Sequence, residues 1–96
     1  MRTVVILCES YAECERVLRD RAEKLRYTGQ GFSRTQWRLK TADGTTIMAV
    51  STSDPSWREK LRGRRISDYQ VMPGAEVSSD DIARIIRPGM VGEERP

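Results

Sequence analysis

The chain has 96 residues, close to the commonest size of a single domain, and this length excludes a two-domain enzyme. A content of 38% hydrophobic and 32% charged residues is too apolar for a disordered tail and too polar for a membrane protein. The 17 basic residues exceed the 14 acidic ones by three, which permits nucleic acid as a partner without requiring it.

The amino-terminal segment predicts a buried strand followed by a helix. Residues Thr3 to Cys8 are apolar after the threonine, as in a central strand covered on both faces. Ser10 and Glu13 form a capping-box pattern, so a helix should begin there. Its apolar positions recur at spacings of three and four, and it should end near Tyr27, before a glycine-containing loop.

An antiparallel hairpin is expected next. Residues Arg34 to Lys40 alternate between polar and apolar side chains, which is typical of a half-exposed strand. Asp43 and Gly44 favour a turn, and Thr45 to Val50 should return as the second strand. If this hairpin forms a sheet edge, Trp37 and Leu39 would supply an interface.

A short helix and a further short strand follow. Asp54 is expected to cap a helix with Pro55 at its first position, and this helix should continue to about Leu61. Gly63 should end it. Asp68 to Met72 then predicts a short strand, because a proline and a glycine break the chain directly afterwards.

The last helix is expected to begin at Ser78, whose hydroxyl precedes acidic residues in the first turn. Its apolar face would comprise Ile82, Ile85 and Ile86. Pro88 and Gly89 should end it.

This order, β-α-β-β-α-β-α, predicts a small α/β fold with a mixed sheet of about four strands, a long helix after the first strand and a short carboxyl-terminal helix. Residues 1–90 would form one domain and residues 91–96 a flexible tail. No secretory signal is visible at the amino terminus, so we expect a cytoplasmic protein.

The side-chain inventory excludes several chemistries. Without histidine the chain has no Ser-His-Asp triad, Cys-His pair or histidine-ligated metal. Cys8 and Cys14 are too few for a structural zinc site and should be reduced, buried thiols. Asp80 and Asp81 are better explained as helix-capping residues than as metal ligands. We therefore expect no catalytic constellation, metal or cofactor.

The strongest indication of a binding surface is the concentration of basic residues from Arg58 to Arg65. It would neutralise phosphates of a nucleic acid, with Trp57 stacking on a base at its edge. The alternative is an exposed loop whose arginines pair with Glu76, Asp80 and Asp81. The candidate nucleic-acid-binding residues are Arg58, Lys60, Arg62, Arg64, Arg65 and Trp57.

A family resemblance runs through Asp54-Pro55 and the segment Leu61 to Met72. This region resembles the stretch of phage terminase large subunits, and of related P-loop helicase-type ATPases, in which a Leu-Arg-Gly segment leads into the Walker B strand. Val4 to Cys8 with its helix, and the hairpin around Asp43-Gly44, are similar to the elements that precede this region in the family.

Two departures alter what the resemblance implies. The phosphate-loop strand and helix are missing, and Pro73-Gly74 followed by Ala75-Glu76 occupies the position of the acidic pair after the Walker B strand. The resemblance therefore implies a reduced, ATP-incompetent core, encoded by a phage and located in the host cytoplasm, that acts by binding.

The sequence thus favours a small non-enzymatic protein that contacts nucleic acid, or a nucleic-acid-processing complex, through its arginine-rich segment. The alternative is a protein-interaction module that modulates a host protein without binding nucleic acid. An enzyme that uses carboxylates is a third hypothesis, which the missing histidine and phosphate loop disfavour.

Overall fold

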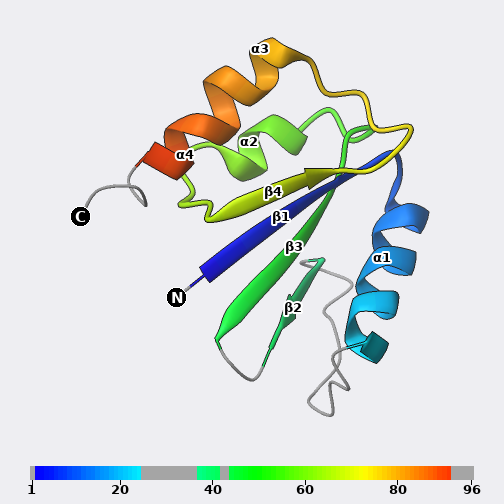
Figure 1. Ribbon diagram of the computed structural model, residues 1–96. Coiled ribbons are helices and arrows are strands. Elements are labelled where there is room, and N and C mark those ends of the chain that lie inside the picture. Colours follow the sequence, from blue (N-terminus) through cyan, green and yellow to red (C-terminus); the bar gives the residue numbers. More distant parts are fainter. Residues whose placement is uncertain (1, 25–36, 42–43, 92–96) are drawn as a thin grey trace.

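The computed structural model describes residues 2–24, 37–41 and 44–91, and it confirms the predicted small α/β fold with a four-stranded mixed sheet (Figure 1). The elements are β1 (Arg2–Cys8), α1 (Tyr11–Lys24), β2 (Arg38–Lys40), β3 (Thr45–Ser51), α2 (Trp57–Leu61), β4 (Asp68–Val71), α3 (Ser79–Asp81), the π-helical segment η1 (Ile82–Ile86) and α4 (Arg87–Val91). Across these described ranges, no helix is long and apolar enough to cross a membrane.

The sheet has the strand order β2-β3-β1-β4. β1 pairs in parallel with β3 and β4, and β2 pairs antiparallel with β3. In this register Leu7 lies beside Val50 on one side and Val71 on the other. The first strand is therefore central, as predicted, and its last four residues, Val5 to Cys8, have no exposed surface.

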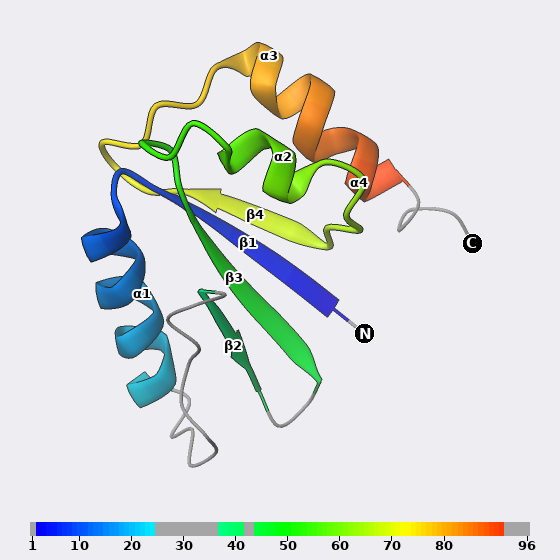
Figure 2. The same ribbon diagram turned by 180° about the vertical axis from the view of Figure 1, so that it is seen from behind.

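Two apolar cores lie on opposite faces of the sheet (Figures 1 and 2). α1 covers one face, and α2, η1 and α4 cover the other. The α1-side core contains Ile6, Cys8, Cys14, Val17, Leu18, Leu39, Ile47 and Ala49. The opposite core contains Val5, Leu7, Met48, Val50, Trp57, Leu61, Ile66, Ile85 and Ile86. β1 supplies alternate residues to both cores, and this explains why its sequence is continuously apolar.

α1 begins where the sequence indicates. The Ser10 hydroxyl accepts a hydrogen bond from the backbone N–H of Glu13 at 3.3 Å. The Glu13 side chain does not complete a capping box, because its carboxylate binds Arg16 one turn later at 2.5 Å. The structure follows α1 to Lys24, and the predicted end near Tyr27 lies outside the described residues.

β2 forms the edge of the sheet, as the hairpin predicts, but it does not expose Leu39. That side chain has no exposed surface and packs in the core under α1. Trp37 has a left-handed backbone with φ of 53° and stacks on the Tyr11 ring at 5.2 Å between centroids. The expected interface of Trp37 and Leu39 is therefore wrong for Leu39. Residues 34–36 lie outside the described part of the chain.

α2 starts later than predicted. It begins at Trp57, and Asp54 acts on the turn before it, where Oδ1 accepts hydrogen bonds from the Ser56 amide at 2.9 Å and the Ser56 hydroxyl at 2.8 Å. Gly63 follows the helix with φ of 75°, a conformation that favours glycine, and this agrees with its predicted role as the helix stop.

Ser78 caps α3 as expected. Its hydroxyl accepts from the Asp81 amide at 3.1 Å, and the Asp81 carboxylate accepts from the Ser78 amide at 3.2 Å. The prediction that Pro88 and Gly89 end this helix is wrong. The helix continues through η1, after which the Arg87 amide donates to the Ile82 carbonyl, and α4 follows directly and includes Pro88 and Gly89.

Gly89 allows α4 to pack against the segment between α2 and β4. A Cβ atom at position 89 would lie 2.2 Å from the carbonyl oxygen of Arg64. The amide of Ile66 donates to the Gly89 carbonyl at 3.2 Å, and the Ile66 side chain is fully buried. α4 includes Val91, one residue into the expected tail, and residues 92–96 are not described.

Candidate functional site

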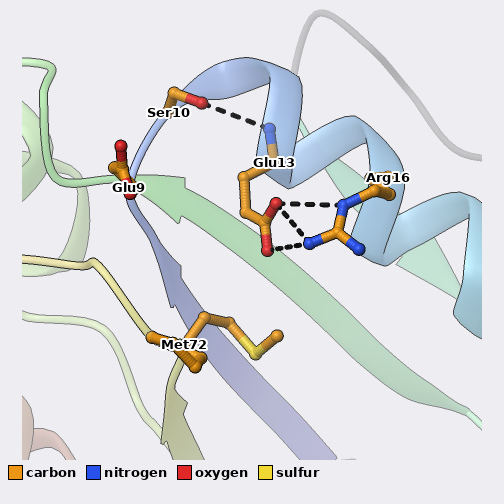
Figure 3. Close-up of a pocket in the computed structure, with 6 residues that line it drawn as sticks. Glu9, Ser10, Glu13, Arg16 and Met72 are labelled. Atoms are coloured by element: carbon orange, nitrogen blue, oxygen red, sulfur yellow. Dashed lines mark hydrogen bonds and ion pairs between the residues drawn. The ribbon is translucent and has the colours of Figure 1, made fainter.

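A cavity lies where the polypeptide leaves the carboxyl ends of β1 and β4 (Figure 3). β1 leads to α1 on one face of the sheet, and β4 leads to α3 on the other, so the two connections diverge. Ligands of open α/β sheets bind at such a switch point. The cavity has a volume of about 340 Å³ and is lined by Glu9, Ser10, Glu13, Arg16, Met72 and Pro73.

One wall of the cavity is an ion pair on the first turns of α1. Arg16 Nε and Nη2 donate to the Glu13 carboxylate at 3.0 and 2.5 Å (Figure 3). The Glu13 side chain is 19% exposed and that of Arg16 is 73% exposed, so the carboxylate is the more enclosed partner. The Glu13 carboxylate raises the pKa of Arg16, which remains charged.

Glu9 forms the opposite rim. Its side chain lies against the turn after β4, because a Cβ atom at Gly74 would be 2.2 Å from Glu9 Oε2. Gly74 has φ of 91°, so this turn suits glycine for both space and backbone conformation. Among the described residues the Glu9 carboxylate makes no hydrogen bond or ion pair.

A second group of side chains ties together the loops after β1 and β3. The Tyr11 hydroxyl donates to the Asp54 carboxylate, and Lys60 Nζ donates to Tyr11 Oη at 2.8 Å and to Asp54 Oδ2 at 3.0 Å. The Tyr11 hydroxyl, the Ser56 donors and Lys60 lower the pKa of Asp54. The hydrogen bonds of Lys60 to Tyr11 and Asp54 raise the pKa of Lys60. These groups satisfy one another, so we assign them a structural role.

The structure divides the predicted basic run into two parts. Arg58 and Lys60 belong to α2 and are engaged: Arg58 binds the Asp81 carboxylate at 2.8 and 3.2 Å, and Lys60 binds Asp54. The Arg58–Asp81 pair agrees with the alternative prediction that this segment pairs with acidic residues. Glu76, another expected partner, donates its backbone N–H to the Thr52 hydroxyl.

Trp57 does not form an exposed edge. Its side chain is 1% exposed and packs in the core with Leu61 and Ile66, while the Arg58 guanidinium lies 4.7 Å from the ring centroid. Stacking on a base requires an accessible ring face. We therefore remove Trp57 from the candidate interface.

The other part of the run, Arg62, Arg64 and Arg65, lies on the segment between α2 and β4, and all three residues are exposed. We call them the amino-edge arginines, because this segment leads to the amino end of β4, beside α4 (Figure 1). Arg62 forms an exposed pair with Glu59 at 3.4 Å. Arg64 Nε donates to the Lys60 carbonyl at 2.6 Å, which leaves its terminal amino groups for other contacts.

The two cysteines are free and buried, as predicted. They belong to one core, and the contact with Cys8, together with burial, raises the pKa of Cys14, so this thiol stays protonated. Across residues 2–24, 37–41 and 44–91, no three Cys, Asp or Glu side chains come together as metal ligands.

Sequence reasoning missed the cavity residues Glu9, Arg16 and Met72. Part of this cavity could have been predicted from the sequence, because a buried strand followed by a capped helix places polar residues at the carboxyl edge of a sheet. The missing information was that β4 is the parallel neighbour of β1, which brings Met72 next to α1.

No protein-family model, curated protein or solved structure matches the chain.

Proposed function

We propose that this protein binds the sugar-phosphate backbone of nucleic acid through the amino-edge arginines. The observation that carries the proposal is that three exposed guanidinium groups lie within four residues of a segment that is anchored at both ends. Guanidinium groups bind phosphate oxygens through paired N–H donors, and neutralised phosphates release counterions.

The anchors hold the backbone that carries the three arginines. On the α2 side, the amides of Arg62 and Arg64 donate to the carbonyls of Arg58 and Leu61, each at 3.1 Å. On the β4 side, Ile66 is buried, and the amide of Ser67 donates to the Thr3 carbonyl at 2.8 Å. Because the backbone is already ordered, binding costs mainly side-chain entropy.

Neighbouring charges favour an anion at this edge. Arg2 begins β1 and Arg87 begins α4, so both lie near the same end of the sheet as the amino-edge arginines; Arg2 Nη2 also lies 4.0 Å from the Asp68 carboxylate at the start of β4. Six of the acidic side chains lie at the opposite end, in loops after strands and in first helical turns. Those acidic residues are Glu9, Glu13, Asp54, Glu76, Asp80 and Asp81.

The same geometry favours binding without sequence preference. The only tryptophan near the basic run, Trp57, is buried, so its ring does not stack on a base. Phosphate contacts fix position but carry no base information. We infer a protein of phage type that acts in the host cytoplasm on nucleic acid, or on a complex that processes it.

The test is fluorescence anisotropy with a labelled single strand and a labelled duplex across a salt series. A triple variant, Arg62→Ala with Arg64→Ala and Arg65→Ala, should weaken binding equally for different sequences. It should also reduce the slope of log affinity against log salt by roughly one unit per lost contact.

The matched control is Arg58→Ala with Lys60→Ala, which removes two cations of the same run that are already paired with Asp81 and Asp54. This control should lose thermal stability and keep its affinity for nucleic acid. If the parent protein does not bind at low salt, or the triple variant binds as tightly as the parent, the proposal is wrong, and an acidic protein becomes the expected partner of this surface.

We further propose that the protein does not use ATP, in keeping with a reduced ATPase-like core. The β1–α1 connection carries Glu9 and the first turn of α1 carries Glu13, and both carboxylates repel phosphate. Isothermal titration with ATP and magnesium should show no heat of binding. Micromolar affinity would contradict this proposal.

A further inference from the structure

We propose that the cavity between α1 and the end of β4 binds a protonated alkyl amine. This site is separate from the proposed nucleic-acid surface, because it lies at the carboxyl ends of β1 and β4, whereas the amino-edge arginines lie near the amino end of β4. Its volume of about 340 Å³ is within the range of small-molecule sites.

The charge of the lining disfavours an anion. A phosphate at a helix start needs free backbone amides, and here the Ser10 hydroxyl already occupies the amide of Glu13. The ionisable side chains that face the cavity are two carboxylates, Glu9 and Glu13, and one guanidinium, Arg16, so their formal sum is one negative charge.

Glu9 is an exposed residue at the rim of the cavity, and it is the group available to a cation. Arg16 already binds both oxygens of Glu13, whereas Glu9 has no partner among the described residues. The close approach of its carboxylate to Gly74 places it over the turn that closes the cavity. An ammonium group in the cavity would supply the positive charge and the N–H donors that Glu9 lacks.

The rest of the lining fits an alkyl chain. Met72 is half-buried, packs against the core under α1 and extends its thioether toward the cavity (Figure 3). Pro73 adds a second apolar surface. Methionine adapts to irregular apolar ligands because its side chain is unbranched and polarizable. The ligand class is therefore an amine with a short apolar body.

Arg16 opposes this ligand in two ways. It adds a positive charge to the cavity, and it occupies the Glu13 carboxylate that would otherwise form a second contact. Replacement of Arg16 should therefore increase amine affinity, whereas replacement of Glu9 should decrease it. This opposite pair of effects separates a defined site from general attraction of cations to an acidic surface.

The experiment is an NMR titration of the full chain at low salt and pH 7 with 1,4-diaminobutane as the probe. Butane-1,4-diol, which has the same length and no charge, is the control ligand. We expect the diamine to shift the Met72 methyl signal and the amides of Glu9 and Ser10. The diol should leave these signals unchanged at the same concentration.

Three variants complete the test, each first checked for an unchanged circular dichroism spectrum. Glu9→Gln should weaken diamine binding by about threefold to fivefold, the effect of one partly exposed ion pair, and Arg16→Gln should strengthen it by about twofold. Glu15→Gln changes a carboxylate on α1 that pairs with Arg19 outside the cavity, and it should have no effect. Equal binding of diol and diamine, or equal losses in the Glu9 and Glu15 variants, would overturn the proposal.

Discussion

At the scale of a single residue, replacement of Leu7 tests whether β1 lies in the core. It is fully buried in the central strand, and its register partner on β4, Val71, is 40% exposed. Leu7→Ala should lower the free energy of unfolding by about 2–5 kcal/mol, because it removes buried methyl groups and leaves a cavity. Val71→Ala, the control in the same row of the sheet, should cost less than about 1 kcal/mol. Urea unfolding measures both, and similar losses would mean that the sheet does not bury β1 as described.

At Gly89, a close backbone contact should reverse the usual stabilising effect of replacing a helical glycine by alanine. In the interior of a helix, glycine to alanine usually stabilises by about 1 kcal/mol. Here the added Cβ atom would meet the backbone oxygen of Arg64 at 2.2 Å, and the backbone cannot rotate away as a side chain does. Gly89→Ala should therefore lower the free energy of unfolding by about 1–3 kcal/mol.

A second readout locates the effect of Gly89→Ala. The amide of Ile66 donates to the Gly89 carbonyl, so displacement of α4 should speed hydrogen exchange at Ile66. A variant more stable than the parent, with Ile66 still protected, would show that α4 does not pack against this segment.

At the scale of elements, Asp81 connects α3 to α2 and makes this connection depend on pH. Arg58, with the amide and hydroxyl of Ser78, lowers the pKa of the Asp81 carboxyl below its usual value of about 3.9. A group with a lowered pKa in the folded state stabilises the protein above its unfolded pKa, and this stabilisation is lost as the pH falls through the folded pKa.

The free energy of unfolding should therefore decrease as the pH is lowered below about 4, and this decrease should be shallower in Asp81→Asn. Asp80→Asn is the matched control, because Asp80 is 68% exposed and pairs with Arg84 on the next turn of the same helical segment. Urea unfolding from pH 3 to pH 6 gives the slopes. An Asp81 variant with the slope of the parent would exclude a role for this carboxylate.

The elements that sequence patterns predict well are those that local chemistry determines. The apolar run before Cys8, the capping box at Ser78 and the glycine after α2 each specify their structure without distant partners. The continuation of the last helix through Pro88 was not predictable in this way, because the π-helical η1 shifts the hydrogen-bond register before the proline.

The candidate sites were less predictable, because they depend on contacts between distant segments. The basic run looks uniform in sequence, yet α2 directs Trp57 into the core and Arg58 toward Asp81. A five-residue helix has too few turns for its periodicity to show which side faces the core. The cavity needed the parallel pairing of β1 with β4, which no local pattern specifies.

At the scale of the whole molecule, many carboxylates lie at the carboxyl edge of the sheet, and the cations of the α2–β4 segment lie at the amino edge. Chains enter helices at the carboxyl edge of the sheet, where first-turn acidic residues complement the helix dipole, and this gathers carboxylates at one end. The cations of the α2–β4 segment lie at the other end. The net charge is only +3, but the charges are distributed unevenly over the molecule. The position of the charged groups, more than the net charge, should therefore decide what the protein binds.

This distinction between position and total charge can be measured. Removal of the three amino-edge arginines reduces 17 cations to 14 against 14 anions, so the net charge falls from +3 to zero. Replacement of Arg16, Arg19 and Lys24 by alanine produces the same net charge, but these cations lie on α1, which covers the face of the sheet opposite to α2. At about 0.1 M salt the Debye length is about 10 Å, so charges on distant edges act largely independently.

In the anisotropy assay the amino-edge variant should lose nucleic-acid affinity, and the α1 variant should retain most of it. Equal losses in the two variants would show that net charge alone controls binding.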